Sequence, residues 1–139
     1  MRYIIDTHIF LWSLFEPEKI PSKAAAAIQS QQNSIFVSVI SFWEISLKYS
    51  LGKLALKGIA PHELPDFTAK INFEVLELSI EDAASFYRLP RVPHKDPFDR
   101  MIIWQAIRNN MVLISKYRPA YFLRSYITCD LEFEISKPN

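Results

Sequence analysis

The chain has 139 residues, of which 50% are hydrophobic and 14% aromatic, so it fits one domain over residues 1–139 with a sizeable core and is not intrinsically disordered. Sixteen Lys and Arg residues against fifteen Asp and Glu residues give a net charge of +1, which neither favours nor excludes a nucleic-acid partner. The single cysteine, Cys129, excludes an internal disulfide framework and a cysteine-based zinc site, and we expect a reducing, cytoplasmic setting.

The start of the chain, "MRYIIDTHIFLWSLFEPE", is apolar but fits neither a membrane span nor a signal peptide. No apolar run reaches the roughly 18 to 20 residues that a helix needs to cross a bilayer. Asp6 and His8 interrupt the stretch, and no small-residue cleavage site follows. We therefore expect a soluble protein without a membrane partner, beginning with a strand that runs into a turn.

Short apolar runs alternate with longer helical stretches along the chain. We predict strands at residues 2–6, 34–40, 73–79 and 111–115, and a fifth strand at 127–135 on an edge of the sheet. We predict helices at about 21–31, 41–51, 61–70, 80–87 and 97–109. This order predicts an α/β fold with mainly parallel strands and crossover helices on both faces of the sheet.

Four acidic residues fall where such a sheet places its functional sites, at the carboxyl ends of the strands. Asp6 ends the first predicted strand, and Glu44 lies in the first turn of the helix after the second. Asp96 and Asp99 open the helix that leads into the fourth strand. We expect these four carboxylates, which come from three separate segments, to face one cleft.

Three of these acids also have a purely structural interpretation as helix caps. Ser41 and Glu44 have the spacing of a capping box, and Asp96, Pro97 and Asp99 suit the first positions of a helix. Taken singly, Glu44 and Asp96 are better explained as caps, and for Asp99 the two interpretations are balanced. Asp6 is no obvious cap, and an unpaired buried carboxylate is costly.

Carboxylates gathered in one cleft repel one another unless a cation neutralises them. A site of oxygen ligands alone suits Mg²⁺, which would activate a water and stabilise charge on a phosphodiester. The only glycines, Gly52 and Gly58, form no phosphate-binding loop of the ATP or NAD type. The pattern therefore favours metal-assisted phosphodiester hydrolysis.

Several stretches resemble a known family, the PIN-domain ribonucleases, and in particular the toxin half of VapBC-type toxin–antitoxin pairs. The resemblance is carried by "YIIDTHIFLW", "VSVISFWEISLKYSLGKL", "HKDPFDRMIIWQA" and "LISK", in that order and nearly from end to end. It implies that Asp6, Glu44 and Asp99 are the core acids, with Asp96 beside them. It also implies a three-layer α/β/α sandwich with a mainly parallel sheet of four to five strands.

The same resemblance implies an activity and partners. The activity is endonucleolytic cleavage of RNA that depends on Mg²⁺ or Mn²⁺. The partners are a second copy of the chain, in a homodimer, and a VapB-like antitoxin whose tail covers the acidic cleft. Because such antitoxins bind DNA, the chain is expected to meet DNA only indirectly.

One position departs from the family pattern. A fourth acid commonly follows the strand-four Ser or Thr, and Tyr117 stands there in this chain. Loss of that charge weakens the case for a second metal ion. The alternative function is therefore a catalytically weakened PIN-like module that binds RNA or an antitoxin.

A signalling receiver domain is a further alternative, because it too combines an acidic pocket with a lysine at a strand end, here Lys116. A receiver needs a phosphoacceptor aspartate after its third strand. The chain offers only Asp82 there, inside the following predicted helix.

Other polar residues are candidates for supporting roles. Thr7 and Ser115 are placed to hydrogen-bond the carboxylates or a metal-bound water, or simply to complete strand ends. His94, Lys95 and Arg100 lie beside the acidic segment and are candidates for contacts with RNA phosphates. For Lys48, Lys53 and Lys57 we favour a solvated helix face over RNA binding.

Overall fold

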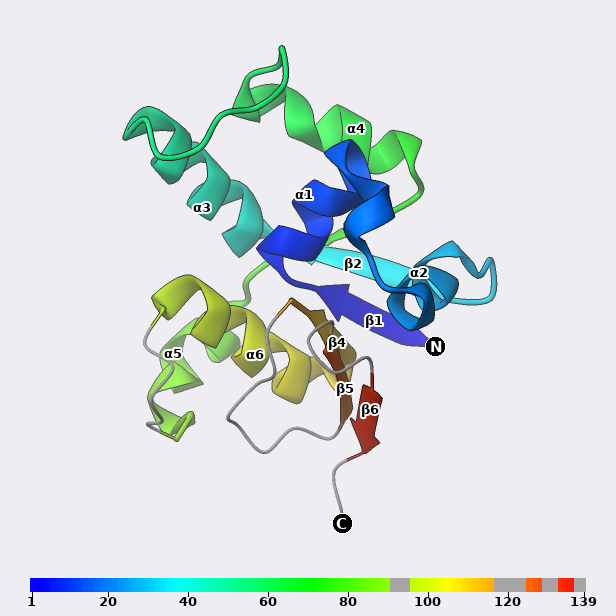
Figure 1. The fold of residues 1–139 in the computed structure, drawn as a ribbon. Helices are drawn as coiled ribbons and strands as arrows, with labels where there is room; N and C mark the ends of the chain where they lie inside the picture. Colours follow the sequence, from blue (N-terminus) through cyan, green and yellow to red (C-terminus); the bar gives the residue numbers. More distant parts are fainter. Residues whose placement is uncertain (91–95, 117–124, 129–132, 137–139) are drawn as a thin grey trace.

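The computed structural model of the chain describes residues 1–90, 96–116, 125–128 and 133–136, and its centre is a six-stranded sheet (Figure 1). The strands are β1 (Arg2–Ile5), β2 (Ser34–Ser38), β3 (Glu74–Leu76), β4 (Val112–Ser115), β5 (Ser125–Thr128) and β6 (Phe133–Ser136). Their order in the sheet is β3-β2-β1-β4-β5-β6, and every pairing is parallel except that of β5 with β6. The predicted mainly parallel sheet is confirmed, with β1 and β4 adjacent at its centre.

The helices of the described residues are α1 (Thr7–Phe15), α2 (Ser22–Gln29), α3 (Val39–Ser50), α4 (Leu64–Lys70), α5 (Ile80–Ser85) and α6 (Pro97–Asn109). Short 3-10 helices at Pro17–Lys19, Pro61–Glu63 and Phe86–Arg88 extend the connections. None of the helices in these described ranges is long and apolar enough to cross a membrane.

Alternation along the central strands separates two hydrophobic cores, one on each face of the sheet. Tyr3 and Ile5 of β1 face the core formed with α1, α2, α3 and α4, while Ile4 faces the core formed with α6. β4 alternates in the same way, with Ile114 in the first core and Leu113 in the second. Because successive side chains of a strand point to opposite faces, a strand buried on both faces reads as one apolar run. The predicted α/β/α sandwich is confirmed, and its layers are visible in Figure 1.

Several predicted elements differ from those observed, among them the strand predicted at 73–79, which spans only Glu74–Leu76. The start of the chain does not run into a turn, because α1 begins at Thr7 directly after β1. The predicted strand at 34–40 ends earlier, at Ser38, whose hydroxyl accepts the Ile40 N–H at 3.0 Å and caps α3. The single edge strand predicted at 127–135 is an antiparallel pair, β5 and β6, so the prediction of four to five strands was too low. Residues 129–132, which include Cys129, lie outside the described residues.

A buried hydrogen bond fixes α6 against the sheet. Gln105 is completely buried in the middle of α6, and its Oε1 accepts a hydrogen bond from the Ser38 hydroxyl at the end of β2. Its Nε2 donates to the carbonyl of Glu77, beyond β3, at 3.4 Å. Because both polar ends of this side chain are bonded to the sheet's carboxyl edge, the start of α6 is held near that edge.

Candidate active site

Asp6 stands where β1 ends and α1 begins. Its N–H donates to the carbonyl of Ile114 at 3.0 Å, which continues the ladder between β1 and β4. One carboxylate oxygen, Oδ1, accepts the N–H of Ile9 at 2.9 Å, so Asp6 is the N-cap of α1. The other, Oδ2, accepts the Ser115 hydroxyl at 2.8 Å and the Lys116 N–H at 2.9 Å. The end of β4 thus holds the first predicted acid in place.

Burial raises the pKa of the Asp6 carboxyl above its ordinary value. The residue is only 3% exposed. Hydrogen bonds from Ile9, Lys116 and Ser115 and the charge of nearby His8 favour the ionised form, but the loss of solvation outweighs them. The protein therefore compensates the negative charge of Asp6 incompletely, and a cation beside it would lower the pKa again.

Glu44, in the second turn of α3, is the other buried acid, at 2% exposed. Its Oε1 accepts the Thr7 hydroxyl at 2.6 Å, and its Oε2 pairs with the Lys48 ammonium at 2.5 Å. The Ser41 hydroxyl lies 2.9 Å from that of Thr7. The predicted capping box of Ser41 and Glu44 is therefore wrong, because α3 begins before Ser41 and both side chains point into the protein toward α1.

The remaining two predicted acids, Asp96 and Asp99, lie at the start of α6. Asp96 is its N-cap and accepts the N–H groups of Phe98 at 2.8 Å and Asp99 at 3.4 Å. Asp99 lies in the first turn, and both acids are half-buried. The Phe98 ring packs edge-on against Trp43 of α3, with 5.1 Å between centroids. This contact seats the first turn of α6 beside the segment of α3 that carries Glu44.

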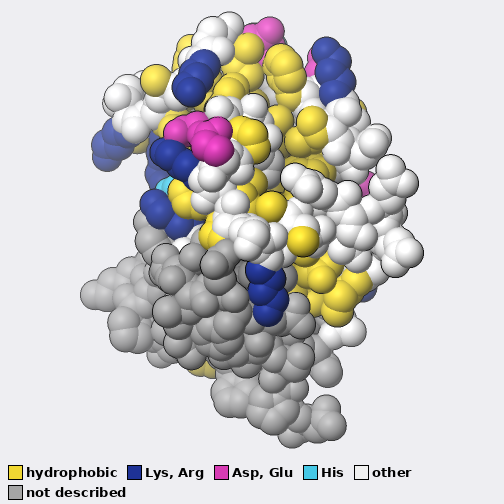
Figure 2. Space-filling model, turned by 45° about the vertical axis from the view of Figure 1, so that its right-hand side comes forward, with side chains coloured by type: hydrophobic (Ala, Val, Ile, Leu, Met, Phe, Trp, Pro, Cys, Tyr) yellow, Lys and Arg dark blue, Asp and Glu magenta, His cyan; other side chains and the backbone are white. Residues whose placement is uncertain are grey.

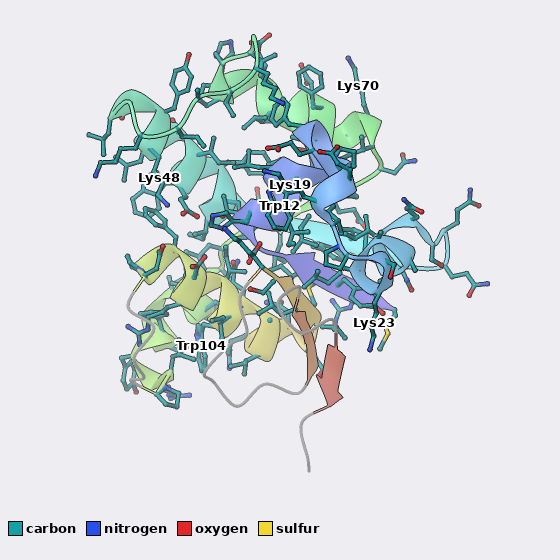
Figure 3. All side chains as sticks on the ribbon, viewed as in Figure 1. Trp12, Lys19, Lys23, Lys48, Lys70 and Trp104 are labelled. Atoms are coloured by element: carbon teal, nitrogen blue, oxygen red, sulfur yellow. The ribbon has the colours of Figure 1, made fainter. Side chains whose placement is uncertain are left out.

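Lys48 lies among these acids. Its ammonium is 5.9 Å from the centroid of the Phe98 ring, on the side of α3 that faces α6 (Figure 3). Partial burial acts to lower the pKa of Lys48, but the hydrogen bond and charge of Glu44, together with Asp96 and Asp99, raise it above its ordinary value. The expectation of a solvated helix face holds only in part for Lys48, because its side chain is partly exposed but its ammonium pairs with the buried Glu44 carboxylate.

Two further residues near the acids were not singled out from the sequence as parts of the site. Burial lowers the pKa of the His8 imidazole, and among its charged neighbours Asp6 and Glu44 oppose this change while Lys116 and Lys48 add to it. The ammonium of Lys116 stands 5.8 Å from the centroid of the Trp12 ring of α1. Of the contacts around the acids, that of Lys48 with Glu44 had a signal in the sequence, because residues four apart on a helix are neighbours.

We call Asp6, Glu44, Asp96 and Asp99 the acidic site. The structure brings Asp6 and Glu44 near each other at the start of α1, where Asp6 caps the helix and the adjacent Thr7 hydrogen-bonds Glu44. The two α6 acids act on Lys48 nearby. Within the described ranges, no three His, Cys, Asp or Glu side chains are grouped closely enough to hold a metal ion. The donor chemistry still suits a hard divalent cation, because all four side chains offer carboxylate oxygens and Asp6 carries a poorly compensated charge.

The other candidates divide into residues that the structure places and residues outside its described ranges. The Arg100 guanidinium stacks over the Phe86 ring, 5.0 Å from its centroid. Tyr117, which stands where the family commonly has its fourth acid, lies outside the described residues, as do His94 and Lys95.

Asp82, the aspartate that a receiver domain would need, is remote from the acidic site. It is buried in the first turn of α5 and accepts hydrogen bonds from Arg108 Nε at 2.9 Å and Asn109 Nδ2 at 3.2 Å. Arg108 lies at the end of α6, twelve residues and therefore about 18 Å along the helix from Asp96. A carboxylate engaged there is no phosphoacceptor for the acidic site, so this placement argues against the receiver alternative.

Comparison with known proteins places the chain in a family. Residues 3–117 match the PIN domain, and the chain belongs to the PIN domain family. The family predicted from the motifs is thus confirmed. No curated protein sequence is significantly similar to the chain.

Solved structures share the fold at low sequence identity. A chain of VapBC2 from Rickettsia felis, bound to a promoter DNA fragment, is 19% identical with a TM-score of 0.61, covering 84% of this chain and 89% of its own. A chain of DNA-bound VapBC from Salmonella typhimurium is 17% identical with a TM-score of 0.57, covering 84% and 86%. A chain of FitAB bound to the IR36 DNA fragment is 17% identical with a TM-score of 0.57, covering 82% and 84%.

Proposed function

We propose that the chain is a metal-dependent endoribonuclease, the toxin of a VapBC-type toxin–antitoxin pair, and that it hydrolyses RNA phosphodiester bonds at the acidic site. The observation that carries this proposal is the gathering of Glu44, Asp96 and Asp99, from α3 and the start of α6, around Lys48. The buried Asp6 lies next to this group, because Thr7, the residue after it, hydrogen-bonds Glu44. PIN domains are generally nucleases, and the fold matches are to chains of toxin–antitoxin complexes.

Each residue of the acidic site has a distinct task in this proposal. Asp6 and Glu44 are the buried ligands of Mg²⁺ or Mn²⁺, with Asp99 completing the set and Asp96 adding charge at the helix start. Ser115 and Thr7 orient the first two carboxylates through the hydrogen bonds described above. The chemistry that a bound divalent ion supplies is activation of water and stabilisation of charge on the phosphodiester.

An antitoxin tail is the partner that best fits the surface beside the acidic site. A pocket of about 140 Å³ lies between α1 and the segment after α3, and its lining includes His8, Trp12 and Leu56. His8 is also close enough to Asp6 and Glu44 to interact with their charges, so the pocket lies beside the acidic site. A tail with an apolar side chain for the pocket and a basic one for the acids would block both, as the VapB-like role requires.

A second copy of the chain is the partner that best fits α3. Val39, Trp43, Leu47 and Leu51 recur every four residues along it, and each is at least 37% exposed. Apolar residues at this spacing form a stripe along one side of a helix, and such a stripe marks an interface. We propose that this α3 stripe contributes to the homodimer. Figure 2, turned by 45° from Figure 1, shows apolar side chains at the surface among scattered charges.

The test is cleavage of tRNA and ribosomal RNA by antitoxin-free protein with Mg²⁺, with Mn²⁺ and with EDTA. We expect cuts that require the metal and disappear in Asp99→Asn, because that change removes one ligand charge at the surface of the site. Asp66→Asn, which changes an exposed acid of α4, is the matched control and should cleave like the natural chain. Single-stranded and looped RNA should be cut first, because paired RNA hides its base edges.

The alternative is a module that binds RNA or an antitoxin but has weakened catalysis because Tyr117 stands where the family commonly has an acid. Folded protein that makes no cuts would favour this alternative over the nuclease. Cuts that appear only in Tyr117→Asp would assign the weakness to that position.

A further inference from the structure

The strongest unassigned feature near the acidic site is the ion pair between Lys48 and Glu44. The pair is not a surface contact, because the Glu44 side chain is only 3% exposed and its other oxygen is occupied by the Thr7 hydroxyl. Both Glu44 oxygens are thus engaged by donors, and one of these donors is a cation. A carboxylate oxygen can accept a second contact, but a divalent ion that binds Glu44 must either share it with the Lys48 ammonium, against charge repulsion, or displace that ammonium.

Of the two contacts that Glu44 makes, the one with Lys48 is easier to release than the one with Thr7. The Lys48 ammonium sits on a flexible four-carbon stem with a side chain that is 38% exposed, whereas Thr7 is buried at the start of α1. Leaving Glu44 would return the ammonium to water at little cost. In the metal-free protein, the same ammonium supplies the positive charge for Glu44, Asp96 and Asp99.

We propose that Lys48 is an internal counter-ion that holds the acidic site together without metal and competes with the divalent ion for Glu44. Lys48 has this role only if the acidic site binds a divalent ion, as the proposed function requires. Metal entry is then an exchange of cations, in which the ammonium leaves Glu44 as the ion arrives. The natural chain therefore binds metal more weakly than its carboxylates alone would allow.

The experiment measures Mn²⁺ binding by titration calorimetry and by the electron paramagnetic resonance of free Mn²⁺, without RNA. We expect Lys48→Met to bind Mn²⁺ about tenfold more tightly than the natural chain, because a like charge and a competitor are both removed. Lys48→Gln, which retains a hydrogen-bond donor for Glu44, should show the same gain. Lys48→Arg, which retains the charge, should keep the natural affinity.

Thermal unfolding provides a second readout. Without metal, Lys48→Met should unfold about 3 to 6 °C below the natural chain, because Glu44 loses its counter-charge. With saturating Mn²⁺ this gap should close or reverse. A lysine with a merely structural role would leave the same gap in both conditions and an unchanged affinity.

Two controls locate the effect. Lys23→Met removes the same charge from α2, well away from Lys48 (Figure 3), and should change neither affinity nor the metal-induced shift. Asp99→Asn should weaken Mn²⁺ binding in the natural chain and in Lys48→Met alike. These controls separate competition at the acidic site from a general effect of net charge.

The outcomes separate this inference from the proposed function. Equal or weaker Mn²⁺ affinity in both Lys48→Met and Lys48→Gln, with binding that still depends on Asp99, would overturn the role of Lys48 and leave the metal site standing. Absence of Mn²⁺ binding in every protein would overturn both. Binding that appears only after Lys48 is neutralised would support the exchange in its strongest form.

Discussion

The carboxylate of Asp6 serves two parts of the fold at once. One oxygen begins α1 and the other receives the end of β4, so the residue joins the first and fourth strands through its side chain. Any change at its hydrogen-bond donors should therefore affect both stability and the acidic site.

Ser115→Ala tests the donor from β4. We expect the free energy of unfolding to fall by about 1 to 2 kcal/mol, because a buried carboxylate loses one of its charge-assisted hydrogen bonds. Urea unfolding with EDTA present measures this loss. Ser115→Thr, which keeps the hydroxyl, should recover most of it, and equal stability of the alanine variant and the natural chain would contradict the role of Ser115.

The raised pKa of Asp6 gives a pH dependence with a definite sign. Because the folded pKa lies above the unfolded value, the carboxyl stabilises the fold below its unfolded pKa, and this contribution is lost as pH rises through the folded pKa. Asparagine does not titrate, so Asp6→Asn lacks this dependence. Without metal, the free energy of unfolding of the natural chain minus that of Asp6→Asn should therefore decrease as pH rises above about 4.

His8 titrates in the same window, so the comparison is best made with His8→Gln in both proteins. Its pKa is lowered by burial, so its own contribution is present above the unfolded value and lost as pH falls, which opposes the change from Asp6. A difference that stays flat or rises with pH in this background would contradict the raised pKa of Asp6.

At the scale of single residues, the sequence indicated the acids but not their neighbours. Asp6 was predicted from its place after a strand, a position that topology alone determines. The pairing of Glu44 with Lys48 was missed because a lysine on a helix is usually solvated, and only the burial of its partner makes this one different. Burial of Glu44 depends on how α1 packs against α3, which no local pattern contains.

At the scale of elements, α5 and α6 are joined by a polar cluster away from the acidic site. Asp82 accepts hydrogen bonds from Arg108 and Asn109, and its carbonyl accepts the Trp104 indole N–H at 3.1 Å. This cluster fixes the far end of α6, whereas Gln105 fixes its middle and Phe98 its start.

Asp82→Ala should destabilise the protein without disabling it. We expect a loss of about 1 to 3 kcal/mol, because two hydrogen bonds to a buried carboxylate disappear. RNA cleavage measured well below the unfolding temperature should be unchanged, since the cluster lies about 18 Å along α6 from Asp96. A loss of cleavage in folded protein would indicate that the far end of α6 also controls the acidic site.

A helix was predicted correctly where helix-start residues and a polar face mark it, and was missed where its residues are apolar on nearly every side. The helix predicted at 97–109 matches α6 because Asp96 and Pro97 mark its start. α1 was missed because its residues are hydrophobic on nearly every side, and a helix buried between other elements has no polar face to reveal its period. Asp6 followed by an apolar run was the available signal, since aspartate is a preferred N-cap.

At the scale of the whole molecule, the α3 stripe predicts a change in oligomeric state. Leu47→Glu should convert a homodimer to a monomer, because it places a charge in the apolar stripe. Ile71→Glu, at the end of α4, is a matched control because both residues are 38% exposed. Light scattering during size-exclusion chromatography measures the mass of each protein, and a dimer that survives Leu47→Glu would remove α3 from the interface.

The bond from Ser115 to Asp6 spans 109 positions of the chain and has a consequence for synthesis. A ribosome makes β1 first and β4 far later. Most of the domain must therefore be synthesised before Ser115 and the Lys116 N–H can donate to Asp6. Pairing of strands so distant in sequence is also slow, because the intervening loop must close first. Nascent or prematurely terminated chains that end before β4 therefore carry no assembled acidic site, and any activity of that site can arise only after translation of the domain is nearly finished.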